Sequence, residues 1–272
     1  MQEDLIEIAK HIRRLGLASL AHAQQHTFFY SSDNTYWEDL AVLQAAHAAE
    51  ILIKARIAEH HPLLIFSEIP KSTKVNEEKL SLRALLESGK TIQYNELPER
   101  LWATSGYKIK NDNIYQRFGK LRNTIQHFTT PQDKDLTQET LKFIFGIIDP
   151  MIHDFWGLYA VDYIEDPDAH EYIFKTLLKY NIDFLIPDHY KEKVEKDRLE
   201  LETTVKVITF IKDSINVFSS DTEIDRFEII KYIQNSFNLS EWQAQRLYYD
   251  ARDKIGSDDD SYLEWRITPF IS

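Results

Sequence analysis

The apolar positions recur with helical spacing along almost the whole chain. The clearest stripe comprises Ile114, Phe118, Leu121, Ile125 and Phe128, separated by four, three, four and three residues. This spacing keeps apolar side chains on one side of a helix with 3.6 residues per turn. It predicts an amphipathic helix from about residue 113 to 128, with all five side chains facing a core.

A second segment, from about residue 36 to 59, is almost wholly apolar and rich in alanine. The polar residues between Val42 and Ala55 are Gln44, His47, Glu50 and Lys54. At about 100° per residue they fall within one arc of about 120°. We therefore predict a buried helix with a single polar stripe, which faces either water or a functional cleft bordered by His47 and Glu50.

Further helices are predicted near residues 77–88, 95–105, 137–163, 168–180, 189–217, 221–236 and 240–255. Their ends carry breaking and capping signals: His61-Pro62, Thr129-Thr130-Pro131, Asp135-x-x-Gln138, Ser220-x-x-Glu223 and Ser240-x-x-Gln243. Pro150 predicts a kink in the 137–163 helix. No stretch alternates as a strand would. The fold class is therefore all-α, with an N-terminal helical segment (1–35) packing on a helical bundle (36–165), and an acidic helical region (166–272) after a boundary near 164–171.

The composition excludes several kinds of chemistry. The chain has no cysteine, so it has no disulfide, thiolate nucleophile or cysteine zinc site. With 7 glycines among 272 residues it has no glycine-rich phosphate loop, and we expect no cofactor. The acidic N-terminus does not resemble a secretory signal, and charged residues and Pro150 interrupt the most apolar stretch, 141–161. We expect a cytoplasmic protein with no membrane segment.

The charge is unevenly distributed. The net charge of −12 argues against a protein that coats nucleic acid electrostatically. Between Arg100 and His127, however, six basic residues stand against one acid, whereas residues 195–272 hold ten basic and sixteen acidic residues. A surface that binds phosphate is therefore expected in the first half of the chain. The candidate RNA-binding residues there are Lys108, Lys110, Arg117 and Lys120.

The segment LRNTIQHF, residues 121–128, carries the candidate catalytic residues Arg122, Asn123 and His127. Arginine can donate two hydrogen bonds to phosphate oxygens, and histidine can transfer a proton near neutral pH. Together they can cleave RNA without a metal, with the 2′-hydroxyl of the RNA as nucleophile. Residues five apart on a regular helix are about 140° apart. Either the helix end unwinds or two chains contribute, and we favour a homodimer.

The spacing alone is weak evidence, since Arg56 and His61 repeat it. The second occurrence differs in having Asn123, a basic neighbourhood, and an upstream alanine-rich helix with His47 and Glu50. Together, AAHAAEILIKARIAEHHPLLIF and LRNTIQHF resemble the HEPN family over roughly residues 36–165. That family has a helical bundle and the signature arginine, polar residue, three to five residues, histidine.

The resemblance implies a metal-independent endoribonuclease that acts as a homodimer, with Arg122, Asn123 and His127 of both chains lining the cleft and His47 and Glu50 in support. Many relatives act in toxin–antitoxin, CRISPR-associated or anti-phage systems. In toxins silenced by a nucleotidyltransferase antitoxin, a tyrosine stands two residues after the histidine. Thr129 occupies that place here, which argues against this form of regulation. The alternative function is a non-catalytic scaffold that binds RNA or a protein, in which Arg122 and His127 make structural hydrogen bonds.

Three other groups are better explained without catalysis. His22 and His26 share a helix face but lack the glutamate of zinc proteases, and Asp166, Asp168 and His170 suit a domain boundary. The last two predicted helices, joined at Asn238-Leu239, resemble a helix-turn-helix. Because that region is acidic, packing, dimerisation or binding of a protein partner or antitoxin is favoured there over DNA binding. The aromatic residues Trp242, Tyr248, Tyr249, Tyr262 and Trp265 are interpreted as core or interface.

Overall fold

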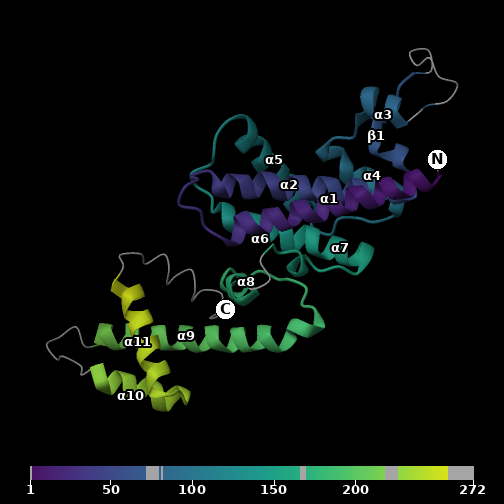
Figure 1. The fold of residues 1–272 in the computed structure, drawn as a ribbon. Coiled ribbons are helices and arrows are strands. Elements are labelled where there is room, and N and C mark those ends of the chain that lie inside the picture. Colours follow the sequence, from purple (N-terminus) through teal and green to yellow (C-terminus); the bar gives the residue numbers. More distant parts are fainter. Residues whose placement is uncertain (1, 72–79, 81, 166–169, 218–225, 257–272) are drawn as a thin grey trace. The chain divides into compact units, whose positions relative to one another are not determined.

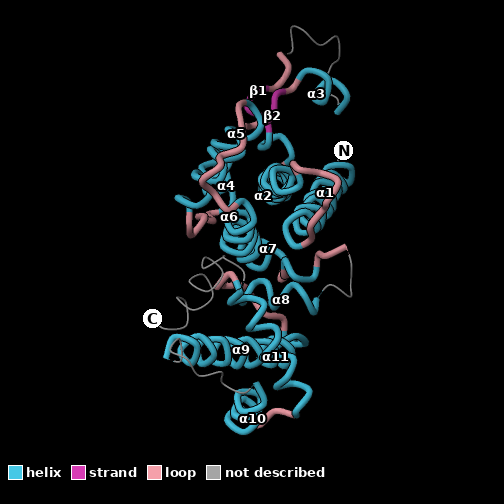
Figure 2. Tube along the Cα trace, turned by 90° about the vertical axis from the view of Figure 1, so that its left-hand side faces the viewer, coloured by secondary structure: helices cyan, strands magenta, loops and turns pink. Residues whose placement is uncertain are grey.

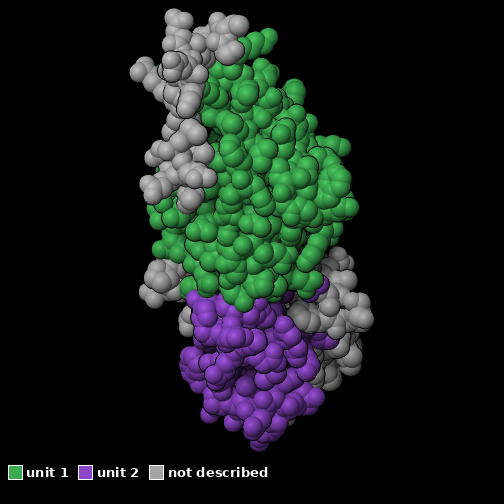
Figure 3. Space-filling view, turned by 90° about the vertical axis from the view of Figure 1, so that its right-hand side faces the viewer, with its two compact units in different colours: residues 1–170, 182–185 green, residues 171–181, 186–272 purple. Residues whose placement is uncertain are grey.

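The computed structural model describes residues 2–71, 80, 82–165, 170–217 and 226–256, and the described chain is overwhelmingly helical (Figure 1). It divides into two compact units (Figure 3). Unit 1 comprises residues 1–170 and 182–185, and unit 2 comprises residues 171–181 and 186–272. The prediction of an all-α protein is confirmed at this level. No helix of the described chain combines the length and apolar character needed to cross a membrane.

Unit 1 holds the segments in which the candidate site was predicted. Its helices are α1 (Gln2–Phe28), α2 (Trp37–His60), α3 (Leu82–Ser88), α4 (Leu97–Ser105), α5 (Asp112–His127), α6 (Leu136–Phe143) and α7 (Asp149–Trp156). Short 3-10 turns lie at Pro62–Ile65 (η1), Tyr94–Glu96 (η3) and Ala160–Asp162 (η5). A π-helical turn, η4 (Ile144–Ile148), separates α6 from α7.

Helix α2 is the centre of unit 1. Viewed nearly end-on in Figure 2, it has α1 on one side and α4, α5 and α6 on the other, and it contacts all four. Its alanines allow these neighbours to approach closely, and seven of them are buried: Ala41, Ala45, Ala46, Ala48, Ala49, Ala55 and Ala58. On α1 the closest approach is at Gly16, where a Cβ atom would lie 2.8 Å from Leu52 Cγ.

Several predicted helix ends are confirmed. His61 leaves α2 in an extended conformation before Pro62, and the Asp135 side chain accepts a hydrogen bond from the Gln138 backbone N–H at 2.8 Å. The Ser240 hydroxyl accepts from the Gln243 backbone N–H at 3.3 Å, and the Gln243 side chain accepts in return from the Ser240 N–H at 2.9 Å. The predicted cap Ser220-x-x-Glu223 lies outside the described residues.

The helix predicted over 137–163 was wrong at its end, since α7 stops at Trp156, but an irregularity at its centre is present as predicted. The π-helical turn interrupts it directly before Asp149 and Pro150. Pro150 lacks the N–H that a continuing α-helix would use, so the π-helical turn lies where the kink was predicted. Gly157, with φ of 67°, ends α7 in the left-handed conformation that glycine adopts without strain.

The core-facing stripe predicted for α5 was wrong at Phe128. Phe118 and Leu121 are buried, whereas Phe128 is 85% exposed. The helix ends at His127, and Phe128 has φ −134° and ψ −73°. The backbone N–H groups of Phe128 and Thr129 both donate to the Thr124 carbonyl, at 2.9 and 3.0 Å. Because Phe128 no longer has helical backbone angles, its side chain does not continue the stripe.

The sequence pattern also did not predict a small two-stranded sheet, whose strands are separated by α3. Strands β1 (Phe66–Glu68) and β2 (Lys90–Thr91) pair antiparallel. Ser67 Oγ donates to the Lys90 carbonyl at 3.0 Å. Strands this short carry too few residues for an alternating pattern to be detected.

All the regular secondary structure of unit 2 in the described residues is helical. It contains α8 (His170–Lys179, with His170 counted in unit 1), η7 (Asp188–Tyr190), α9 (Lys191–Val217), α10 (Arg226–Phe237) and α11 (Glu241–Gly256). Ile230, Ile233, Ala244 and Tyr248 form a buried cluster between α10 and α11. Tyr248 is therefore a core residue as predicted, whereas Trp242 is 66% exposed. Tyr262 and Trp265 lie outside the described residues.

The approach of α1 to α2 gives a first prediction. Gly16→Val should lower the free energy of unfolding by about 1–3 kcal/mol, because added side-chain atoms would overlap Leu52. The measurement is urea denaturation followed by circular dichroism. In the Leu52→Ala background the same substitution should cost less, since the overlapping side chain is gone. Equal costs in both backgrounds would contradict the packing argument.

Candidate functional site

Helix α5 presents a basic face that includes His127. Asn113, Arg117, Lys120, Thr124 and His127 follow one another at spacings of four, three, four and three, which keeps them on one side of the helix. Arg117, Lys120 and His127 are all exposed. The His127 side chain forms no hydrogen bond or ion pair with any described residue. The structure therefore leaves this imidazole accessible to a ligand.

Arg122 lies on a different flank of α5. The helix stays regular through His127, so Arg122 and His127 are about 140° apart around its axis. The first expected alternative, an unwound helix end that brings the two together in one chain, is not observed. Arg122 Nη1 donates to Asn123 Oδ1 at 2.9 Å, so Asn123 restrains the guanidinium. Arg122 is half-buried and Asn123 is exposed.

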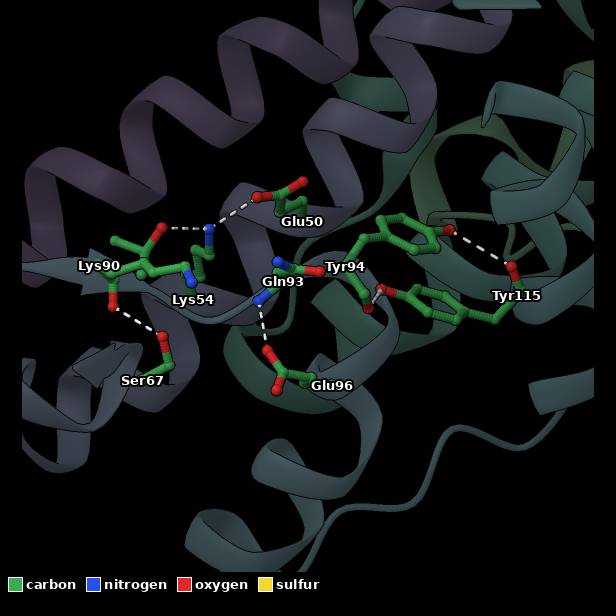
Figure 4. A network of polar contacts seen from close by, with 9 residues as sticks. Glu50, Lys54, Ser67, Lys90, Gln93, Tyr94, Glu96 and Tyr115 are labelled. Atoms are coloured by element: carbon green, nitrogen blue, oxygen red, sulfur yellow. Dashed lines mark hydrogen bonds and ion pairs between the residues drawn. The ribbon is translucent and has the colours of Figure 1, made fainter. Parts of the chain in front are cut away.

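Tyr94 lies against the flank of α5 that carries Arg122. Its ring stacks on Tyr115 with centroids 4.4 Å apart, and the Tyr115 hydroxyl donates to the Tyr94 carbonyl at 2.9 Å (Figure 4). A Cβ at Gly119 would lie 2.5 Å from the Tyr94 ring, so only glycine admits the ring at this position. Tyr94 is thus held between two residues of α5.

The charges of Arg122 and Glu50 both act on the Tyr94 hydroxyl. Burial raises the pKa of Tyr94 strongly, its hydrogen bond with Tyr115 and the positive charge of Arg122 lower it, and the negative charge of Glu50 raises it. Glu50 of α2 and Arg122 of α5 therefore both lie within electrostatic reach of this hydroxyl. Tyr94 could not be predicted from the sequence, since a single tyrosine in a short turn carries no spacing signal.

The polar stripe of α2 leads into this region. Lys54 Nζ lies 2.6 Å from Glu50 Oε1 and donates to Thr91 Oγ1 of β2 at 3.3 Å (Figure 4). The pair is largely covered, with the Lys54 and Glu50 side chains 12% and 21% exposed. Glu96 closes the next turn by accepting from the Gln93 backbone N–H at 2.8 Å. The stripe thus ties α2 to the β2 and η3 segment that carries Tyr94.

The remaining predicted site residues are dispersed. His47 is exposed on α2. Lys108 lies over the Trp102 ring at 5.4 Å, and Lys110 pairs with Asp154 at 3.6 Å. Arg117 pairs with Glu139 at 3.4 Å. Lys120 forms no ion pair with a described residue, so Lys120 and His127 are the two candidate site residues on the basic face without a described side-chain partner.

The second arginine–histidine pair has an evident structural role. Arg56 Nη1 donates to Glu59 at 2.8 Å and its guanidinium lies over the Phe155 ring, while His61 Nδ1 accepts from the Leu63 backbone N–H at 3.2 Å. Both side chains are engaged in local packing and capping. This occurrence of the spacing is therefore explained without catalysis.

His22 and His26 also form local contacts. Their Nε2 atoms lie 3.1 Å apart, and His22 Nδ1 lies 3.2 Å from Glu165. Burial lowers the pKa of His26, whose ring packs on Trp37. Among the described residues, no group of three or more histidine, aspartate or glutamate side chains could hold a metal ion. Asp166 and Asp168 are outside those residues, and His170 contacts the Val161 carbonyl at 3.1 Å.

Comparisons of the chain with protein families, with curated proteins and with solved structures found no match.

The covered Glu50–Lys54 pair gives a second prediction. Lys54→Met should lower the free energy of unfolding by about 1–2 kcal/mol, because it leaves a largely covered carboxylate without its partner. Lys10→Met is the matched control, since the Lys10–Glu7 pair is also helical but 47% and 64% exposed. It should change stability by less than about 0.5 kcal/mol. Similar losses in the two variants, measured by urea denaturation, would contradict the assigned role of Lys54.

Proposed function

We propose that the protein is a metal-independent endoribonuclease of HEPN type, in which His127 transfers a proton and Arg122 stabilises the charge on the scissile phosphate. The observation that carries the proposal is the exposed His127, which has no partner among the described residues and shares a face with Lys120 and Arg117. A histidine with a structural role would be expected to pack against its own chain, as His26 does. The proposed biology is cleavage of RNA in defence or stress.

The active form is proposed to be a homodimer with a composite site. Because α5 is regular, a phosphate bound at His127 lies on the opposite flank from Arg122 of the same chain. A two-fold axis beside α5 would bring Arg122 of one chain toward His127 of the other. Asn123 then keeps the guanidinium in position before the RNA binds, which lowers the entropic cost of forming the site.

The proposed reaction requires no water in its first step. The 2′-oxygen attacks the neighbouring phosphorus while one histidine accepts its proton. The bond from phosphorus to the 5′-oxygen breaks, and the same histidine donates that proton to the leaving oxygen. The products are a 2′,3′-cyclic phosphate and a 5′-hydroxyl. Arg122 stabilises the negative charge that the non-bridging oxygens gain in the transition state.

The third prediction is that purified protein cleaves structured RNA or tRNA in EDTA and leaves these two product ends. Arg122→Ala and His127→Ala should each reduce the rate at least about a hundredfold, the scale of losing one proton-transfer or charge-stabilising group. Arg14→Ala and His60→Ala, which remove an exposed arginine and histidine elsewhere on unit 1, serve as controls and should retain activity.

Full activity of both the Arg122 and His127 variants would refute the assignment. Binding of RNA by wild type and by His127→Ala without cleavage by either would instead favour the non-catalytic scaffold.

A further inference from the structure

An exposed aromatic and acidic surface lies at the end of unit 1 where α5 ends. Two connections meet there, residues 29–36 between α1 and α2 and residues 128–135 between α5 and α6 (Figure 1). The buried Asp39 carboxylate accepts a hydrogen bond from the Thr130 hydroxyl, which joins the start of α2 to the second connection. Trp37 Nε1 donates to the Phe29 carbonyl at 2.9 Å, and this hydrogen bond joins the two ends of the 29–36 connection.

Three aromatic side chains in these connections are largely exposed to solvent. Tyr30 is 88%, Tyr36 66% and Phe128 85% exposed. A large aromatic side chain left in water gives up the free energy that its burial would supply, and such groups mark interaction sites when several occur together. We name the surface formed by Tyr30, Tyr36, Phe128 and the acidic residues around them the end patch.

The end patch is negatively charged. Between them, residues 29–39 and 127–135 carry five acidic side chains, Asp33, Glu38, Asp39, Asp133 and Asp135, against one lysine, Lys134. None of the five carboxylates forms an ion pair with a described residue. Partial burial together with the charges of Asp135 and Asp39 raises the pKa of Glu38. Negative potential is therefore concentrated beside the exposed aromatic rings.

The exposed aromatic side chains and the negative charge of the end patch together favour one kind of ligand. A phosphate backbone would be repelled by the four exposed carboxylates of Asp33, Glu38, Asp133 and Asp135, whereas the basic face of α5 ends one residue before Phe128, at His127. Arginine and lysine side chains complement both components, because they pair with carboxylates and pack over aromatic rings. We propose that the end patch binds a basic segment of a separate protein, with cationic side chains over Tyr36 and Phe128.

The position of the end patch suggests what this partner does. His127 is the last residue of α5 and Phe128 directly follows it. A segment seated on Phe128 covers the imidazole and blocks RNA from the basic face. The binding surface stands independently of catalysis, but this inhibitory consequence rests on the proposed ribonuclease function.

The test uses the full chain and a fluorescein-labelled peptide of alternating arginine and serine, followed by fluorescence anisotropy. Phe128→Ser and Tyr36→Ser should each weaken binding about two- to fivefold, the scale of one exposed cation–π contact. Glu38→Gln should weaken it as well. The matched control is Trp242→Ser, which removes an exposed aromatic residue beside Glu241 on unit 2 and should leave binding unchanged.

Three results would overturn the end-patch proposal. The first is equal binding by all variants, which would mean attraction to the net charge alone. The second is loss of labelled oligouridine binding in Phe128→Ser with peptide binding intact, which would make the patch an RNA platform. The third is dissociation of a wild-type dimer by Phe128→Ser in light scattering, which would assign the patch to a second copy.

Inhibition of RNA cleavage by the peptide is measured separately. It should be present in wild type and weaker in Phe128→Ser. If the wild-type protein does not cleave RNA, the proposed function fails while the peptide titration still decides the end patch. If cleavage proceeds but the peptide binds all variants alike, the end patch fails and the proposed function stands.

Discussion

The close packing of helix α2 against its neighbours is the constraint on which the rest of unit 1 depends. Buried alanines let α1, α4, α5 and α6 approach α2 from several sides. Close helix packing leaves little surface for polar groups, so the polar residues of α2 between Val42 and Ala55 are confined to one stripe. Glu50 and Lys54 therefore reach the segment carrying Tyr94, beside α5. The candidate site is a consequence of how this central helix is enclosed.

Helix α5 separates two kinds of surface. Its buried stripe, through Phe118 and Leu121, fixes the rotation of the helix about its axis. That rotation directs Arg117, Lys120 and His127 to solvent and leaves Arg122 half-buried on another flank. Past His127 the backbone turns, and the charge changes from basic to acidic within a few residues. The proposed substrate surface and the proposed partner surface thus meet at one histidine.

Helical periodicity predicted the parts of this arrangement that depend on local sequence. The bounds of α2 and α5, the cap at Asp135 and the polar stripe of α2 all follow from spacing, side-chain size and proline. Features set by tertiary contacts were missed. Tyr94 acquires its place only because Gly119 leaves room for its ring, and Phe128 leaves the core stripe only because the helix ends one residue earlier. Neither the space beside Gly119 nor the exact end of α5 can be predicted from the spacing of apolar residues.

The central claim is that two chains share one site, and mixing two inactive variants tests it most directly. Arg122→Ala and His127→Ala chains are denatured together, refolded and assayed for RNA cleavage. If each site takes Arg122 from one chain and His127 from the other, mixed dimers hold one intact site and activity returns to about a quarter of the wild-type value. If the mixture stays as inactive as either variant alone while mixed dimers form, the two residues do not act across chains and the account is contradicted.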